Sequence, residues 1–215
     1  MTNFNSIGKP FIYLITEGEA TAENFAEKKA ILKLIKNAVQ AKISLIQIRE
    51  KQLSARLVFE LAAEAVKLAQ NTETKILIND RADIALAANA DGVHLTSHSL
   101  AADIIRRNFP DDFIIGVSTH TIEEAEKAKK NGADFATFSP IFDSPGKSNP
   151  QGLEKLREVC EKLKPFPIVA LGGIDETNYK SVLDNGASGF AAIRYLNDAE
   201  KFKRFLKKSE AEACA

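Results

Sequence analysis

The sequence lacks several kinds of residue that mark particular classes of protein. Among 215 residues it has two cysteines, one methionine, three histidines and no tryptophan, and its 29 basic side chains are matched by 29 acidic ones. The two cysteines, Cys160 and Cys214, lie far apart and make no disulfide framework, which indicates a reducing compartment. A formal net charge of zero excludes general electrostatic attraction to nucleic acid or to an anionic membrane.

Long apolar runs are also missing. Because no run of about 18 apolar residues occurs, the sequence predicts no membrane span, and residues 1–10 lack the basic start and apolar stretch of a signal peptide. We therefore expect a cytoplasmic protein without nucleic-acid or membrane partners. The length suits a single domain over residues 1–215, with an ordered core at about 10–208 and loose ends at 1–9 and 209–215.

What the sequence does contain is eight short apolar runs separated by amphipathic segments. Such runs are typical of parallel strands buried on both faces, and parallel strands need crossover connections, which helices supply. Eight units in about 200 residues predict an α/β fold, a (β/α)8 TIM barrel; a doubly wound open sheet is the alternative. Similar turns precede three of the runs, at 89–92, 131–134 and 185–189. The runs are residues 11–16, 44–48, 75–79, 91–95, 113–118, 134–138, 167–171 and 188–193, and the helical segments are 22–41, 54–70, 122–130, 153–163, 176–183 and 199–207.

In such a barrel the reactive groups follow the carboxyl ends of the strands. After the second run, alternation puts Gln47, Arg49 and Lys51 on one face of the strand and its extension. Two cations are not buried unpaired, and converging basic groups suit a phosphate or diphosphate. The alternatives are that Gln47 is a buried polar residue of a barrel layer and that Arg49 pairs with a carboxylate at a solvated strand end.

Two other loops indicate anion binding. Gly172 and Gly173 follow the seventh run, where glycines let the backbone approach an anion and where barrels often bind phosphate. Lys147 lies in the longest loop, residues 139–151, whose proline and glycine content is typical of a lid. A lysine there could clamp an anion, or it could be an ordinary exposed side chain.

Acidic and imidazole groups complete the set of candidates. Asn79 and Asp80 could hold Mg²⁺, although Asp80 could instead cap a helix over residues 81–88. His120 could donate a proton or a hydrogen bond to a substrate, with Thr121 capping the next helix. We expect His94, inside a strand, to be structural. The three histidines show no zinc spacing, and Cys160 is predicted to be a packed thiol.

Several motifs, in order along residues 11–205, carry a resemblance to a known family. The chain resembles thiamine phosphate synthase and its relative, the TenI-type thiazole tautomerase. The motifs are Gln-x-Arg-Glu-Lys at 47–51, Ile-Asn-Asp-Arg at 78–81, Ala-Asp-Gly-Val-His-Leu at 90–95, Gly-Val-Ser-Thr-His-Thr at 116–121, Pro-Ile-Phe at 140–142 with Lys147, and Ala-Leu-Gly-Gly-Ile at 170–174.

The resemblance implies a (β/α)8 barrel that joins hydroxymethylpyrimidine diphosphate to thiazole phosphate and releases diphosphate with Mg²⁺ present. Diphosphate leaves first, and the thiazole nitrogen attacks the pyrimidine-methyl cation that remains. Asp80 would hold Mg²⁺, and Ser118 would contact diphosphate or pyrimidine. The thiazole phosphate would bind at Gly172, Gly173 and the backbone of Ile193 and Arg194. The residues implied to neutralise the leaving diphosphate, where charge develops, are Gln47, Arg49, Lys51, Asn79 and Lys147.

Three departures from the family pattern stand out. The usual second Mg²⁺-binding aspartate after the fourth strand is Ser99, which leaves one carboxylate and a hydroxyl, a weaker site for the cation. After the eighth strand the usual Ser-Ala-Ile is Arg-Tyr-Leu at 194–196, and in the lid the usual threonine is Gly146. Arg194 could bind an anion itself, or its bulk could block the phosphate.

The departures keep two other functions open. A TenI-type tautomerase needs only proton transfer on a thiazole carboxylate phosphate, with His120 as its acid-base group and no metal. A non-catalytic relative that binds a ligand is the third possibility. The assembly, for which a homodimer is considered, does not follow from the sequence.

Overall fold

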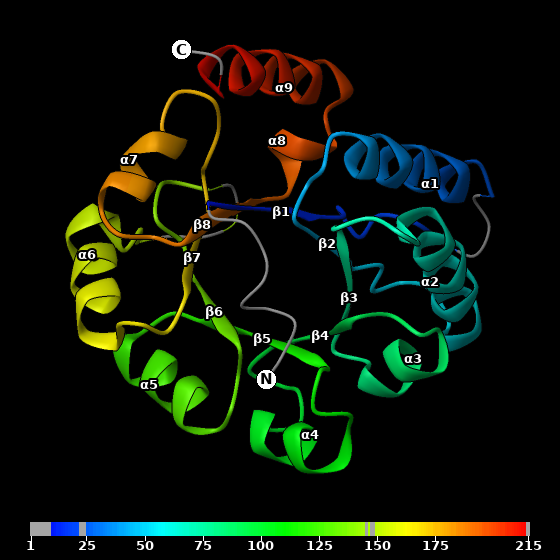
Figure 1. The fold of residues 1–215 in the computed structure, drawn as a ribbon, viewed down its shortest axis with the longest axis horizontal. Helices are drawn as coiled ribbons and strands as arrows, with labels where there is room; N and C mark the ends of the chain where they lie inside the picture. Colours follow the sequence, from blue (N-terminus) through cyan, green and yellow to red (C-terminus); the bar gives the residue numbers. More distant parts are fainter. Residues whose placement is uncertain (1–9, 22–24, 145, 147–148, 214–215) are drawn as a thin grey trace.

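The computed structural model describes residues 10–21, 25–144, 146 and 149–213. Eight parallel strands close into a barrel, in which each strand pairs with the next along the chain and β8 pairs with β1 (Figure 1). The predicted (β/α)8 barrel is confirmed, and the open-sheet alternative is wrong because the sheet closes. The strands are β1 (Phe11–Ile15), β2 (Leu45–Ile48), β3 (Lys75–Asn79), β4 (Gly92–Leu95), β5 (Ile114–Thr119), β6 (Phe135–Phe138), β7 (Ile168–Leu171) and β8 (Gly189–Ala192).

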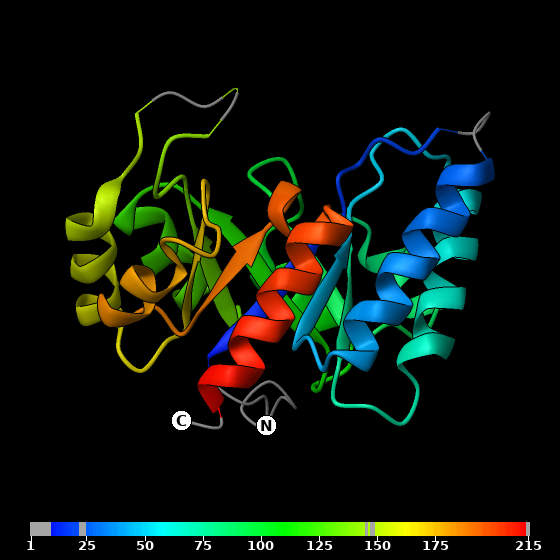
Figure 2. The same cartoon turned by 90° about the horizontal axis from the view of Figure 1, so that it is seen from above.

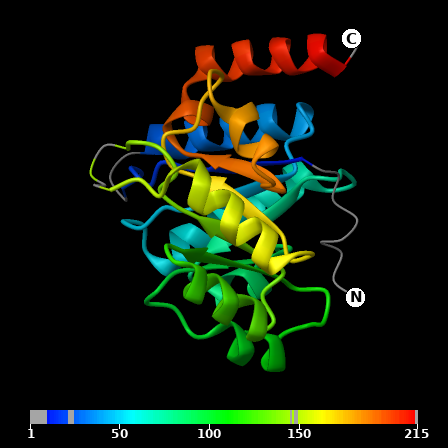
Figure 3. The same ribbon diagram turned by 90° about the vertical axis from the view of Figure 1, so that its left-hand side faces the viewer.

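Helices surround this barrel on the outside, as Figures 1 and 3 show. Most fall within a few residues of the predicted segments. Residues 209–213, predicted as part of a loose end, lie in a helix, because α9 continues to Ala213 through Ala, Glu and Lys residues that favour helix. The helices are α1 (Phe25–Gln40), α2 (Ala55–Ala69), α3 (Ala82–Ala87), α4 (Ala102–Asn108), α5 (Ile122–Lys130), α6 (Gly152–Leu163), α7 (Tyr179–Asp184), α8 (Arg194–Asn197) and α9 (Ala199–Ala213).

The barrel interior is filled by side chains that alternate along each strand. One buried apolar cluster, separate from the shell between strands and helices, occupies this interior, as expected where inward and outward positions alternate. Two residues further along several strands, the inward positions turn polar, which forms a layer just below the open end of the barrel. The polar layer comprises Gln47, Asn79, His94, Ser118 and Thr137, and the apolar cluster comprises Phe11, Tyr13, Ile15, Leu45, Leu77, Ile114, Phe135, Val169 and Ala191.

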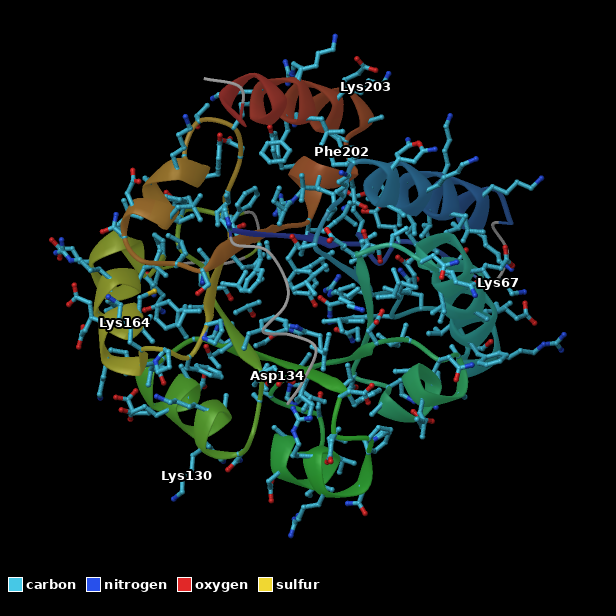
Figure 4. The ribbon with its side chains drawn as sticks, in the orientation of Figure 1. Lys67, Lys130, Asp134, Lys164, Phe202 and Lys203 are labelled. Carbon is cyan, nitrogen blue, oxygen red and sulfur yellow. The ribbon has the colours of Figure 1, made fainter. Side chains whose placement is uncertain are left out.

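At the opposite end of the barrel, two aspartate side chains connect neighbouring strands by hydrogen bonds. They come from the turns at residues 89–92 and 131–134. The carboxylate of Asp91 accepts a hydrogen bond from the backbone N–H of Ile76 (2.8 Å), and that of Asp134 accepts one from Ile115 (2.7 Å). Asp134, labelled in Figure 4, also pairs with Arg106 at 2.7 Å. These bonds tie the residue before one strand to the preceding strand, so they hold the register of the barrel.

All strands point their carboxyl ends in one direction, upward in Figure 2, and we call that open end the mouth. The β1–α1 and β6–α6 connections rise above the barrel there. The described helices include none long and apolar enough to cross a bilayer. The chain therefore places its polar layer and its longest loops at the same end of the molecule.

Candidate active site

Two amide side chains join β2 to β3 at the mouth. Gln47 is 2% exposed, and its Nε2 donates to Oδ1 of Asn79 at 3.0 Å. Strand register places the two residues two positions apart across the pair, with Gln47 opposite Leu77. Gln47 is thus buried in a barrel layer, as its alternative interpretation held, and it contacts Asn79, another residue predicted to bind the diphosphate.

Arg49 lies just beyond β2 and is held by the β1–α1 connection. Its backbone N–H donates to Oγ1 of Thr16 (2.8 Å), and its guanidinium donates to the carbonyl of Glu17 (3.0 Å). Gly18, at φ +86°, makes room for this contact, since a Cβ there would lie 2.6 Å from the Arg49 carbonyl oxygen. Among the described residues, Arg49 therefore donates to a carbonyl and not to the carboxylate of the alternative interpretation.

Lys51 lines a cavity of about 400 Å³ between the connections that follow β2, β3 and β4. We call it the β2–β4 cavity. Arg81 and His98, two residues that the sequence did not assign to a site, contribute to the same wall. Lys51 and Arg81 therefore share one wall with Asp80 and Asn79, and the guanidinium of Arg81 also pairs with Asp83 at 2.6 Å. The lining residues are Ile48, Glu50, Lys51, Leu53, Ala55, Val58, Asn79, Asp80, Arg81, Ile84, Thr96 and His98.

Asp80 receives a hydrogen bond from the hydroxyl of Ser99. Ser99 is fixed in turn by the backbone N–H of Thr96, which donates to its Oγ at 2.7 Å. Asp80 has φ +64°, and its own N–H donates to the carbonyl of His94. The helix-cap interpretation of Asp80 is wrong, because α3 has Arg81 at its N-cap position and no side-chain cap bond.

His94 connects Tyr13 to Ser118 inside the barrel. Its Nδ1 lies 3.1 Å from Oη of Tyr13, and its Nε2 lies 2.9 Å from Oγ of Ser118. Burial lowers the pKa of His94 from 6.5 to about 3 and raises the pKa of Tyr13 well above its usual value. The sequence did not indicate Tyr13 as a site residue, because it lies inside an apolar strand, where an aromatic residue normally belongs to the core.

His120 follows β5, and one nitrogen of its ring is held by a hydrogen bond. Its Nδ1–H donates to the carbonyl of Ser139 at 2.7 Å, since a carbonyl can only accept, so Nε2 is the ring nitrogen left for other contacts. The backbone N–H of His120 donates to the carboxylate of Glu124 at 2.6 Å. The predicted Thr121 cap is confirmed, because its hydroxyl accepts from the N–H of Glu124.

A second cavity, of about 370 Å³, lies beside the two glycines that follow β7, the β7–β8 cavity. Gly172 and Gly173 have φ of +104° and +65°, and a Cβ at either would lie 2.7 Å from Pro140 Cα or 2.5 Å from the Asp143 carbonyl oxygen. Only glycine suits such positions. The lining residues are Asp143, Ser144, Leu171, Gly172, Gly173, Ile174, Asp175, Glu176, Ala191, Ala192, Ile193, Arg194, Tyr195 and Lys201.

Arg194 and Tyr195 line this cavity without closing it. Arg194 is exposed, whereas Tyr195 is 6% exposed and packs edge-on against Phe205 at 6.1 Å. Of the other candidates, Lys147 lies outside the described residues. Cys160 is 4% exposed, and burial raises the pKa of its thiol to about 12, as expected of the predicted packed thiol.

These features define a class of protein: a TIM-barrel enzyme whose mouth holds one cavity lined by basic side chains and a second cavity beside a Gly-Gly turn. The chain belongs to the thiamine monophosphate synthase family, whose pattern matches residues 12–196. It is thereby an enzyme of a thiamine-biosynthetic family.

Individual relatives agree with this assignment. A protein of Aquifex aeolicus named putative thiamine-phosphate synthase 2 is 42% identical over 186 residues, which cover 86% of this chain and 96% of the relative. A thiamine-phosphate synthase of Caldicellulosiruptor bescii is 38% identical over 190 residues, covering 87% and 86%. The solved structure of a thiamine phosphate pyrophosphorylase from Pyrococcus furiosus is 27% identical, with a TM-score of 0.78 over 95% of this chain and 98% of that one.

Proposed function

We propose that this chain is a thiamine-phosphate synthase that joins hydroxymethylpyrimidine diphosphate to thiazole phosphate and releases diphosphate. The observation that carries the proposal is the β2–β4 cavity, whose wall brings together Lys51, Arg81, Asp80 and Asn79, with Asn79 bonded to Gln47. Cations at the rim suit a diphosphate, and neutral amides below it suit an uncharged ring.

The basic residues act where charge develops. As the carbon–oxygen bond to the diphosphate breaks, negative charge grows on the leaving group, and Lys51 stabilises that charge more than it stabilises the intact substrate. Arg49, fixed to the carbonyl of Glu17, supplies a second positive charge at the same end of the barrel. Lys147 stays a predicted third contributor.

Mg²⁺ is the cation that the family resemblance implies, and the donors present fit it. Asp80 offers one carboxylate and Ser99 one hydroxyl, which suits a cation that proteins bind through one or two carboxylates and substrate phosphates. When bound, it neutralises charge on the diphosphate. No three His, Cys, Asp or Glu side chains gather into a metal site within the described part of the chain. We therefore expect Asp80 to hold the cation only together with the diphosphate.

The thiazole phosphate is proposed to occupy the β7–β8 cavity. Gly172 and Gly173 let the backbone approach the phosphate closely, and Arg194 and Lys201 are the cations on the cavity wall. The backbone at Ile193 contributes to the same wall. The acceptor nitrogen then lies on the barrel axis between the two cavities, which is where a pyrimidine-methyl cation from the first cavity would be captured.

One observation favours the tautomerase as a second candidate. The ring of His120 is anchored through Nδ1 to the carbonyl of Ser139, so Nε2 is available to exchange a proton with a bound thiazole. This arrangement needs no cation. Both candidates use a phosphorylated thiazole, and they differ in whether the pyrimidine diphosphate reacts.

A paired assay distinguishes the two candidates. The protein is incubated with both synthase substrates and Mg²⁺, and thiamine phosphate is measured; in parallel, the thiazole carboxylate phosphate is incubated in deuterated water, and exchange is followed by NMR. Thiamine phosphate formation that is at least tenfold slower in Lys51→Ala and unchanged in His120→Asn supports the synthase. Exchange without thiamine phosphate, abolished by His120→Asn, would replace it with the tautomerase.

A further inference from the structure

Two buried polar side chains and a half-buried one form a continuous chain across the barrel towards the mouth. Tyr13 on β1 contacts His94 on β4, which contacts Ser118 on β5. Tyr13 is 0% and His94 2% exposed. Phe135 packs against both rings, at 5.7 Å from Tyr13 and 5.9 Å from His94. The two rings are thus fixed by neighbours on several strands.

Gly116 shows that the barrel makes room for the imidazole. A Cβ at this position would lie 2.8 Å from Nδ1 of His94 and 2.4 Å from Cζ of Phe135. Its backbone needs no glycine for conformational reasons, since its φ lies outside the left-handed range. The missing side chain therefore leaves space for the rings of Phe135 and His94.

The number of protons decides the direction of the hydrogen bonds. The phenol of Tyr13 has one O–H, and the imidazole of His94, which is 2% exposed and whose ring contacts only hydroxyl groups by hydrogen bond among the described residues, is neutral and has one N–H. In one arrangement Tyr13 donates to Nδ1, and the Nε2–H donates to Ser118. In the reverse arrangement the Tyr13 O–H has no acceptor among the described residues. A buried donor without an acceptor is unfavourable, so the first arrangement is the stable one.

We infer that Tyr13 and His94 are positioning residues that make the Ser118 hydroxyl a hydrogen-bond donor to the substrate. The Oγ of Ser118 accepts the Nε2–H of His94, and its own proton is left to point into the mouth. The same direction excludes Ser118 as a nucleophile activated by His94. This inference rests on the proposed function, because the acceptor is a lone pair of the pyrimidine ring or of the diphosphate.

A neighbouring hydroxyl supports a ligand at this depth. Thr137 pairs with Ser118 in the β5–β6 register and is 0% exposed. Its Oγ1 is buried and has no hydrogen-bond partner among the described residues. Buried hydroxyls are normally paired, so Thr137 leaves hydrogen-bonding capacity unused next to Ser118, in the polar layer below the mouth.

The tautomer of His94 tests the direction without any assay of activity. The chain has only three histidines, so long-range ¹H–¹⁵N correlation spectra can resolve them, and loss of one set in His94→Gln assigns the signal. We expect an Nε2–H tautomer for His94 in the free protein at pH 7. An Nδ1–H tautomer, or a charged ring, would overturn the inference.

A double-mutant cycle tests whether Tyr13 acts through Ser118. Tyr13→Phe keeps the ring and loses the O–H, and we expect it to lower kcat/KM about tenfold in the wild-type background and less than about twofold in Ser118→Ala. Phe135→Leu is the packing control, because it touches the same rings without a hydrogen bond and should cost the same in both backgrounds. Equal losses from Tyr13→Phe in both backgrounds contradict the inference.

Calorimetry with two probes identifies the acceptor and separates this inference from the proposed function. Hydroxymethylpyrimidine and inorganic diphosphate are titrated into wild type and Ser118→Ala. A loss confined to the pyrimidine assigns the ring as acceptor, and a loss confined to diphosphate assigns a phosphate oxygen; either supports the inference even if no thiamine phosphate forms. Unchanged binding of both probes, or no binding of either to wild type, overturns it.

Discussion

The hydroxyl of Ser99 donates a hydrogen bond to the carboxylate of Asp80 across the β3 and β4 connections. Thiamine phosphate synthases usually have a second Mg²⁺-binding aspartate at this position. In this chain Ser99 occupies it and donates a hydrogen bond to the remaining carboxylate, that of Asp80. The contact lowers the negative charge available to a cation, because one hydroxyl replaces one carboxylate. It also fixes the side chain of Asp80 in the absence of a second ligand.

Restoring the carboxylate should strengthen cation binding. We expect Ser99→Asp to lower the dissociation constant for Mg²⁺, measured by calorimetry with inorganic diphosphate present, by about tenfold, because affinity rises with the number of charged ligands. Ser97→Asp adds the same charge two residues away, at an exposed position that does not line the β2–β4 cavity, and is the control. An equal gain in both variants would attribute the effect to net charge alone.

Removing the Lys51 side chain should impair the reaction of the diphosphate substrate without affecting the binding of thiazole phosphate. We expect Lys51→Ala to lower kcat/KM for hydroxymethylpyrimidine diphosphate about 10- to 100-fold, mainly through kcat, because the charge that Lys51 meets grows in the transition state, and to leave KM for thiazole phosphate unchanged. Lys67→Ala is the control, because Lys67 is an exposed residue on the outer side of α2 (Figure 4). Steady-state kinetics with each substrate varied in turn measures both constants.

Arg194 should recognise the phosphate of the second substrate. We expect Arg194→Ala to raise KM for thiazole phosphate about tenfold, since a charge-assisted hydrogen bond is lost, with KM for the diphosphate substrate unchanged. Lys203→Ala on α9, which pairs with Glu200, serves as the control. If Arg194→Ser, which restores the usual family residue, lowers KM instead, then Arg194 obstructs the cavity and does not bind the phosphate.

Burial of His94 should make the fold sensitive to acid. The unfolded imidazole takes up a proton near pH 6.5, whereas the folded one does so only at about pH 3. The unfolded state therefore binds more protons in this window, and the free energy of unfolding should fall as pH is lowered from about 6.5 to 3, with a slope of at most about 1.4 kcal/mol per pH unit.

Urea unfolding at a series of pH values measures this dependence. His94→Gln should flatten the slope between pH 6.5 and 4, even if it lowers stability at every pH. His98→Gln removes an exposed loop histidine and should leave the slope as it is. A wild-type slope that survives in His94→Gln would assign the acid sensitivity to other groups.

The fold was largely predictable because its signal is repetitive. Eight apolar runs separated by amphipathic segments, most of which read as helices, predict the number of strands, and parallel pairing predicts their order. The side chains that follow each strand could be assigned to one end of the barrel, because parallel strands all point their carboxyl ends in the same direction. Which of them meet could not be predicted, since strand alternation says nothing of contacts across loops.

Asp80 and Tyr13 illustrate that limit. The sequence offered a helix cap or a cation ligand for Asp80, and the actual partner, Ser99, lies 19 residues away in another connection. Tyr13 looks like core in an apolar strand, and its role depends on His94, which is 81 residues distant. One signal was available: a histidine inside a buried strand needs polar partners, which means that other inward residues must supply them.

The hydrogen bonds of Asp91 and Asp134, at the end of the barrel opposite the mouth, affect which substitutions this chain tolerates during evolution. Asp91 and Asp134 tie strand to strand at the end away from the chemistry, so the frame does not depend on the loops at the mouth. Substitutions there, such as serine for aspartate at Ser99 or arginine for serine at Arg194, can accumulate without loosening the strands. Catalytic identity in such a barrel can drift while the protein goes on folding, and overall sequence similarity then records ancestry more faithfully than activity.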